Sequence, residues 1–219
     1  MKKTICLLLA LLLMASLAAC SDEGDVFTAK TYTPEDTEIR GLDIQVEDRE
    51  IVVVPSEDGA YHIDYAESAE EFYEISVTDD GILTMVSGTD KDWTDFIGTS
   101  SSDDDRRITV QVPDAELATL TVSTTQEDIS LPALTVTERV TLTNNGGDIS
   151  FESLGAADAV AVENKNGDIT GTIAGSYDDY AIACTIKKGD SSLQEKEGGT
   201  KTLTAINNNG DIDIQLVGA

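Results

Sequence analysis

The stretch Asn145-Gly146-Gly147-Asp148-Ile149 sets the pattern of this chain, because the same short unit returns at regular intervals. A weaker copy precedes it and three copies follow: Gln126-Glu127-Asp128-Ile129, Asn166-Gly167-Asp168-Ile169, Gly189-Asp190-Ser191 and Asn209-Gly210-Asp211-Ile212. The aspartates at 128, 148, 168, 190 and 211 stand 20, 20, 22 and 21 residues apart. A period near 20 residues is typical of a solenoid or of stacked hairpins, and not of a catalytic motif.

Each unit separates two runs in which apolar and polar residues alternate, such as 159–162 before and 169–173 after the third copy. This alternation predicts strands, and Asn-Gly-Asp predicts a tight turn, where glycine adopts a positive φ at little cost. Stacked about 4.8 Å apart, the units would place Ile129, Ile149, Ile169 and Ile212 in one buried column. We therefore predict an all-β solenoid of ~20-residue repeats.

The aspartates would form a second column, in which neighbouring carboxylates about 5 Å apart repel by roughly 1 kcal/mol in water. Either each aspartate caps its own turn by accepting backbone N–H groups, or the column holds a cation such as calcium, which prefers oxygen ligands. The calcium-binding nonapeptide Gly-Gly-x-Gly-x-Asp is absent, which favours capping. We predict Asp128, Asp148, Asp168, Asp190 and Asp211 as structural turn residues, with no cofactor.

Residues 1–19 have the features of an export signal. Two lysines precede the apolar stretch 5–14, which is shorter than the ~20 residues of a spanning helix. Leu17-Ala18-Ala19-Cys20 resembles the bacterial lipobox, which implies cleavage before Cys20 and acylation, such as palmitoylation, of that residue. A plain secretory signal or a chance cysteine is the alternative.

Acylation decides where the protein is expected. Two or more acyl chains give stable membrane anchoring, so we predict a lipid-anchored protein that faces outside the cytoplasm. Residues 20–36 lack a strong period and are predicted to be a flexible tether, and residues 37–219 the repeat domain.

Net charge limits the partners. The chain carries −28, and removal of residues 1–19 with their two lysines leaves −30. Such a surface repels nucleic acid and anionic lipid, so an envelope protein or glycan that is neutral or basic is the expected partner. Cys184 would be the only cysteine left after processing and acylation, so no intrachain disulfide is expected.

One segment interrupts the pattern. Residues 88–107 are predicted to be a loop insertion that holds Trp93, the only tryptophan, and Phe96. The two aromatic residues either fold back onto the sheet or form a contact patch for a protein or sugar.

Catalytic motifs are missing from the sequence. It contains no HExxH, CxxC pair, Walker loop or dinucleotide fingerprint. His62, the only histidine, lies in an alternating run and is expected on a strand surface; a Ser-His-Asp triad would lack the nucleophile-elbow motif. We therefore predict that the protein is not an enzyme.

The run Ile108-Thr109-Val110-Gln111-Val112-Pro113, residues 117–122 and the successive Asp-Ile turns resemble the putative-adhesin β-strand-repeat family, domain of unknown function family 4097. The resemblance covers roughly residues 38–217. It implies a right-handed, single-stranded β-helix-like solenoid or β-roll in bacterial envelope proteins, and no known activity. Ser191 departs from the pattern, which predicts a widened coil near Lys187 and Lys188.

Three functions follow as hypotheses. The first is a non-catalytic envelope lipoprotein that serves adhesion, envelope interaction or envelope-stress signalling. The second is a polysaccharide-active enzyme on a β-helix, which would need a groove lined by carboxylates with aromatic or basic residues. The third is a calcium-stabilised structural module.

Overall fold

The computed structural model describes residues 26–35, 38–89, 105–113, 116–155 and 158–218. The signal, Cys20, Trp93 and Phe96 lie outside the described residues. The described chain is all-β apart from one 3₁₀ turn, η1 (Tyr177–Asp179). The strands are β1 (Thr28–Tyr32), β2 (Gly41–Gln45), β3 (Glu50–Pro55), β4 (His62–Glu67), β5 (Glu71–Val77), β6 (Ile82–Thr89), β7 (Arg107–Val112), β8 (Leu117–Thr124), β9 (Ile129–Asn144), β10 (Ile149–Gly155), β11 (Ala159–Asn164), β12 (Ile169–Ala174), β13 (Tyr180–Ile186), β14 (Lys201–Asn207) and β15 (Ile212–Val217).

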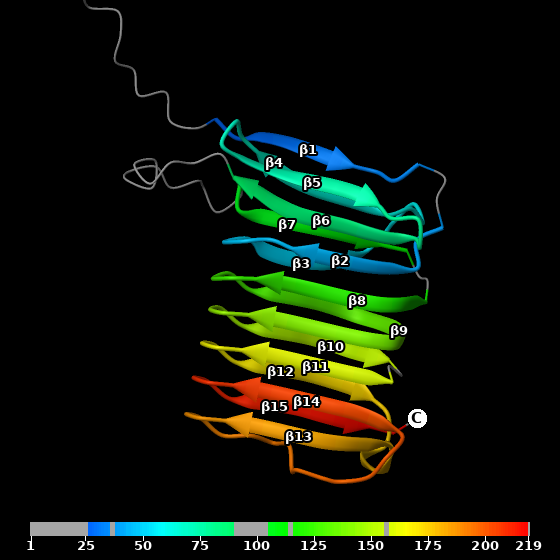
Figure 1. Ribbon diagram of the computed structural model, residues 1–219, viewed down its shortest axis with the longest axis vertical. Helices are drawn as coiled ribbons and strands as arrows, with labels where there is room; N and C mark the ends of the chain where they lie inside the picture. The colour runs from blue at the N-terminus through cyan, green and yellow to red at the C-terminus, as the bar shows by residue number, and fades with distance from the viewer. Residues whose placement is uncertain (1–25, 36–37, 90–104, 114–115, 156–157, 219) are drawn as a thin grey trace, which may run out of the picture.

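The strands stack into two sheets that face each other (Figure 1). In stack order, sheet A holds β1, β4, β7, β3, residues 129–135 of β9, β10, β12 and β15. Sheet B holds β5, β6, β2, β8, residues 139–144 of β9, β11, β14 and β13. Neighbours are parallel except β1–β4, β4–β7 and β5–β6. We call a sheet B strand and the sheet A strand after it a rung.

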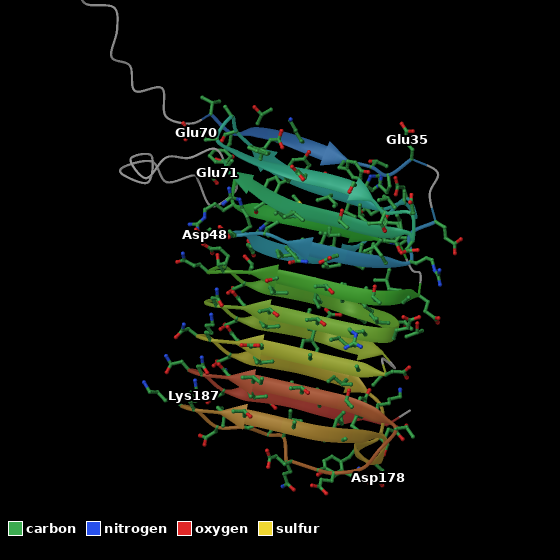
Figure 2. All side chains as sticks on the ribbon, viewed as in Figure 1. Glu35, Asp48, Glu70, Glu71, Asp178 and Lys187 are labelled. Carbon is green, nitrogen blue, oxygen red and sulfur yellow. The ribbon has the colours of Figure 1, made fainter. Side chains whose placement is uncertain are left out.

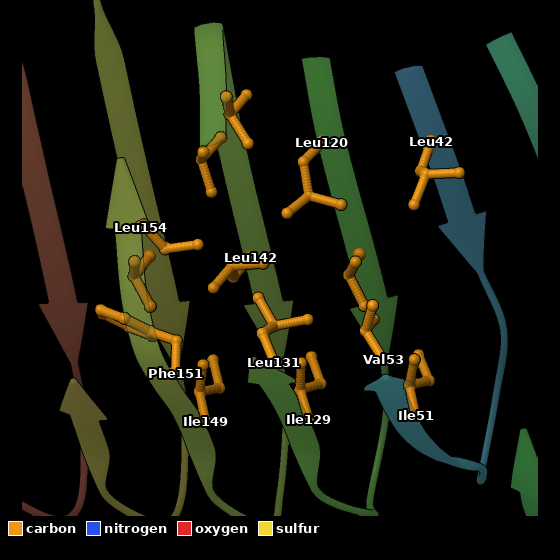
Figure 3. Close-up of a cluster of buried hydrophobic side chains, with 14 of the residues drawn as sticks. Leu42, Ile51, Val53, Leu120, Ile129, Leu131, Leu142, Ile149, Phe151 and Leu154 are labelled. Atoms are coloured by element: carbon orange, nitrogen blue, oxygen red, sulfur yellow. The ribbon is translucent and has the colours of Figure 1, made fainter. Parts of the chain in front are cut away.

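The core is a set of columns between the sheets (Figure 3). The predicted isoleucine column is confirmed, since Ile129, Ile149, Ile169 and Ile212 are register partners and are at most 1 % exposed. Ile51 and Ile108 extend it by two rungs. Each buried isoleucine contributes roughly 1.5–3 kcal/mol, so the column is a main source of stability.

Stack order differs from chain order at both ends of the molecule. The β2–β3 rung lies between the β6–β7 rung and the rung of β8 and early β9. The β14–β15 rung lies between the β11–β12 rung and β13, which comes earlier in the chain. Only the rungs from β8 to β12 follow one another in sequence.

This order explains why the Gly189-Asp190-Ser191 copy departs from the pattern. Its rung is the last of the stack, so Ser191, opposite Ile212, has no further rung to cover it in the described chain. The widened coil predicted near Lys187 and Lys188 is wrong, because these residues bond in register to Asn207 and Gly210. The irregular segment follows them: residues 193–200 cross the outer edge of β13, where Lys196 and Ile182 exchange two backbone hydrogen bonds.

Two predicted boundaries also change. Residues 28–32 of the predicted tether form β1, antiparallel to β4. This strand is short and almost wholly exposed, so it lacks the apolar alternation that marks the other strands. At the ends of the predicted loop 88–107, Gly88 and Thr89 belong to β6 and Arg107 to β7.

Candidate functional site

The turns between the sheets carry an aspartate ladder, Asp128, Asp148, Asp168, Asp211 and Asp190 in stack order. The backbone N–H of each aspartate donates to the Oδ1 of the one before it, at 2.7 Å for Asp148 to Asp128 and 2.8 Å for the other three steps. The prediction that each aspartate caps its own turn is therefore wrong in this respect. Each carboxylate instead accepts a backbone N–H of the next rung. Such charge-assisted bonds offset the repulsion between neighbouring carboxylates.

Two further columns hold the same turns: a column of buried asparagines, which was not predicted, and the column of positive-φ glycines, which was. Asn144, Asn164 and Asn207 are fully buried, and each Nδ2 donates to a carbonyl oxygen of the adjacent rung, at 2.8–2.9 Å. Gly147, Gly167, Gly210 and Gly189 have positive φ, and a Cβ on any of the last three would lie 2.2 Å from the carbonyl oxygen of the neighbouring glycine. The signal available in the sequence was the asparagine four residues before Asp148, Asp168 and Asp211.

The aspartate ladder holds neighbouring rungs together and is not arranged to bind a metal ion. One carboxylate oxygen of four of its members is already used by a backbone N–H. Among the residues that the structure describes, no group of three or more His, Cys, Asp or Glu side chains is placed to hold a metal ion. The geometry therefore gives calcium no chelating cluster at these turns.

His62 lies in a hydrogen-bonded chain with a hydroxyl and a carboxylate. Its Nδ1 is 2.8 Å from Thr33 Oγ1, and its Nε2 is 3.0 Å from Asp58 Oδ2. The backbone N–H of Ala60, then His62 and the Ser56 hydroxyl, lower the pKa of Asp58 to about 2. Although these are the group types of a hydrolase triad, the hollows described below are lined by none of them. The cluster joins the segment after β1 to the β3–β4 loop.

A buried cation fixes the β2–β3 turn. Arg49 is 4 % exposed and donates from Nε to the Tyr73 hydroxyl (2.6 Å), from Nη1 to the Asp48 carbonyl oxygen (2.9 Å), and from Nη2 to Glu71 in an ion pair. Its guanidinium also lies over the Phe27 ring, 5.9 Å from the centroid. Asp48 and Glu71 lie on the same side of the stack as Lys187, which precedes the Asp190 turn (Figure 2). Arg49 thus ties the β2–β3 turn to β5 and to the segment before β1.

The outer face of sheet A has two shallow hollows. The first, about 440 Å³, lies over β1, β4 and β7, and small side chains such as Ala29 and Ala66 line it. The second, about 430 Å³, lies over β3, β9, β10 and β12. One row of register partners runs through both hollows: Thr31, Asp64, Thr109, Val52, Ser130, Ser150 and Thr170. The row is rich in hydroxyls and suits polar contacts with an extended ligand.

Other residues singled out by sequence lie apart from this face. Cys184 is a free, half-buried thiol in the last rung, 3.2 Å from the Ser191 hydroxyl. Within the described part of the chain, no helix is long and apolar enough to cross a membrane.

Solved structures with a similar arrangement come from several bacteria. A putative cell adhesion protein from Clostridium sporogenes has 11 % identity and a TM-score of 0.49 over 88 % of this chain and 99 % of its own. A putative adhesin from Bacteroides fragilis has 15 % identity and a TM-score of 0.39 over 88 % and 97 %. A putative lipid binding protein from Parabacteroides distasonis has 12 % identity and a TM-score of 0.28 over 87 % and 94 %. At these identities and TM-scores, their names carry no conclusion about this chain.

The family is established by sequence. A comparison with curated proteins found no match. The family model described as Toastrack DUF4097 matches residues 39–217, which include every rung from β2 to β15. This match agrees with the resemblance carried by the 108–113 run and the Asp-Ile turns, so the chain belongs to the Toastrack DUF4097 family.

Proposed function

We propose that this protein is a non-catalytic lipoprotein of the bacterial envelope that uses the outer face of sheet A for adhesion to an envelope protein or glycan. The observation that carries the proposal is the hydroxyl-rich row through both hollows of that face. We further propose that the domain is a right-handed solenoid of ~20-residue rungs and that it is anchored to the membrane through acylated Cys20.

The position of β1 sets the orientation that the anchored protein would have. β1 is the outermost strand of sheet A, and β13 lies at the opposite end of the stack (Figure 1). Val26 is the sixth residue after Cys20, and six steps of extended chain reach at most about 20–22 Å. An anchor at Cys20 therefore keeps the β1 end close to the bilayer and directs the β13 end away from it.

The chemistry of the face supports binding rather than catalysis. In the first hollow, Asp64 accepts hydrogen bonds from Thr31 Oγ1 (2.6 Å) and Gln111 Nε2 (2.7 Å), so its carboxylate is already engaged. Arg107, on the same rim, bonds to Glu50. In the second hollow Glu152 is the one charged lining residue, beside Ser130, Ser150 and Thr170. A neutral or basic partner with many hydrogen-bonding groups suits this face.

Anchoring is tested in cells. Cys20→Ala should abolish palmitate labelling and move the protein from the membrane fraction to the soluble one, because the anchor is lost. A Cys20→Ala protein that stays in the membrane fraction would contradict the lipoprotein assignment.

Binding is tested with matched tryptophan variants. Ser150→Trp fills the second hollow, whereas Thr141→Trp, on the outer face of sheet B, leaves it open. We expect Ser150→Trp to weaken binding to a glycan array or purified envelope fractions at least tenfold and Thr141→Trp to leave it unchanged. Equal binding by both variants would exclude this face, and release of reducing sugar from a bound glycan would overturn the non-catalytic assignment.

A further inference from the structure

The β14–β15 rung occupies a slot between two rungs that precede it in the chain. On one side, Gly167 N–H donates to the Asn209 carbonyl oxygen and Ile169 N–H to that of Asp211, both at 2.9 Å. On the other side, Gly210 N–H donates to Lys188 (3.0 Å) and Ile212 N–H to Asp190 (2.9 Å). Because this rung is last in the chain, both of its neighbours are synthesised before it and must leave its place open.

The two walls of the slot match each other. Leu203 of β14 is the register partner of Val160 in β11 and of Ile182 in β13. β13 can thus pack directly on β11 with the same alternation when β14 is absent. The displaced rung would then expose Leu203, Ala205, Ile212 and Ile214, which are at most 3 % exposed in the native stack. Exposing this apolar face to water is unfavourable, and an equivalent slot in another molecule would bury it again.

The connection to the slot has the features of a hinge. Residues 193–200 link the β13 rung to β14, and Gly198 and Gly199 have φ of +84° and +114°. No atom outside the immediate backbone neighbours lies within 4 Å of a Cβ built on Gly198. Eight extended residues reach about 26–29 Å. The hinge is held by the two Lys196–Ile182 backbone bonds, by the Thr200 N–H bond to the Asp179 carbonyl oxygen, and by Lys196 Nζ, which donates to the carbonyl oxygens of Asp178 and Tyr180. Breaking these bonds frees the segment to pass to a neighbouring molecule.

We propose that the β14–β15 rung exchanges between two copies of this chain, so that each copy fills the slot of the other. A reciprocal exchange recreates every contact of the rung and changes only the hinge, which makes it a low-cost route to a dimer. The two β13 ends meet in this dimer. That end is the less acidic one: residues 158–218 hold five basic and ten acidic residues, whereas the described residues of 26–89 hold three and fifteen. Repulsion is therefore smaller there than between β1 ends.

The exchange can be trapped by disulfides in the mature chain, with Cys20→Ala and Cys184→Ser in every variant. Ala161 and Thr204 are register partners across β11 and β14, on the outer face of sheet B. One tagged chain carries Ala161→Cys and a second, differently tagged chain carries Thr204→Cys, and the two are refolded together. We expect a disulfide-linked heterodimer, because the introduced thiols meet only when the rung is exchanged.

The control pair is Thr121→Cys with Thr141→Cys, register partners across β8 and β9, which are consecutive in the chain. This pair should give no linked heterodimer. A single chain that carries both Ala161→Cys and Thr204→Cys should form the bond internally, which verifies the geometry. Internal bonding with heterodimer no higher than the control level would overturn the proposal.

If the disulfide between Ala161→Cys and Thr204→Cys fails to form within one chain, a second measurement, which needs no added cysteines, tests the rung exchange. Deleting Glu197 and Gly198 shortens the hinge and disfavours the closed monomer. After refolding at high concentration, light scattering should find a slowly dissociating dimer in the wild type and a larger dimer fraction in the deletion variant. Monomer alone in both proteins, at every concentration, would overturn the proposal.

Discussion

The carboxylate of Asp168 accepts a 2.8 Å hydrogen bond from the backbone N–H of Asp211, 43 residues further along the chain. The residue one repeat after Asp168, Asp190, instead donates its N–H to Asp211. This pair of contacts places the β14–β15 rung between two rungs that precede it in the chain. It also makes the aspartate ladder directional, since Asp190 receives no such bond from another rung in the described chain.

The direction of the ladder predicts unequal effects of alanine. Asp168→Ala leaves the Asp211 N–H without its charged acceptor and should lower the free energy of unfolding by about 1–2 kcal/mol. Asp190→Ala removes no acceptor of a neighbouring rung and should cost less than about 0.5 kcal/mol. Urea denaturation measures both. Asp168→Asn, which keeps an oxygen acceptor and removes a like charge, should stay near the wild type; equal losses for both alanine variants would contradict the ladder.

The glycine column predicts a strong position dependence. Gly167→Ala combines φ of +115° with a Cβ 2.2 Å from the Gly147 carbonyl oxygen, so the stack must spread. We expect a loss of about 2–4 kcal/mol in chemical denaturation. Gly198→Ala has a similar φ, +84°, but open space around the Cβ, and should lose only about 1 kcal/mol. Indistinguishable midpoints would mean that the close approach of rungs does not matter.

The isoleucine column predicts that a charge inside it prevents folding. Ile169 is fully buried between Ile149 and Ile212, so Ile169→Asp should abolish the cooperative β-sheet signal in circular dichroism. The milder Ile169→Val should cost about 0.5–1.5 kcal/mol. Ile186→Val, in the half-buried last rung, is the control and should cost less. Normal unfolding of Ile169→Asp would contradict the buried column.

Arg49 predicts a difference between a buried and an exposed ion pair. Arg49→Met removes the bonds to Tyr73, Glu71 and the turn, and leaves Glu71 without its cation, so we expect a loss of about 2–4 kcal/mol by thermal or urea unfolding. Arg107, whose side chain is 55 % exposed beside Glu50, gives the control. Arg107→Met should cost less than about 1 kcal/mol. The reverse order would show that the β2–β3 turn is held by other contacts.

Asp58 predicts a pH dependence confined to acid. Its pKa falls from 3.8 to about 2 in the folded protein, so the unfolded chain binds the proton first as the pH drops. The contribution to stability is complete above pH 3.8 and is lost as the pH falls through about 2. The wild type should therefore exceed Asp58→Asn in urea midpoint near neutral pH, by a gap that narrows over this window. Because Asp58 is exposed, added salt should reduce the gap, and a gap that widens towards acid would contradict the assignment.

The columns could be predicted from the sequence, but their order could not. The spacing of Asp128, Asp148 and Asp168 predicted which residues share a column, because a period records equivalence. Equivalent rungs can pack on the same neighbours. The period therefore does not show whether Asp190 or Asp211 follows Asp168 in the aspartate ladder. The signal for order was the loss of isoleucine at Ser191, which marks the uncovered end. β1 was missed because an edge strand held mainly by backbone bonds and polar contacts leaves no apolar pattern.

The rungs displaced at both ends have a consequence for how such a chain can vary in length. A unit appended after β15 would emerge from the interior of the stack and find no free edge beside it. Between β8 and β12, rungs that are neighbours in sequence are also neighbours in space. One whole unit can therefore be duplicated or lost there without changing the strand order at either end of the stack. We therefore expect length variation in this architecture to occur in its middle, with its two terminal arrangements inherited intact.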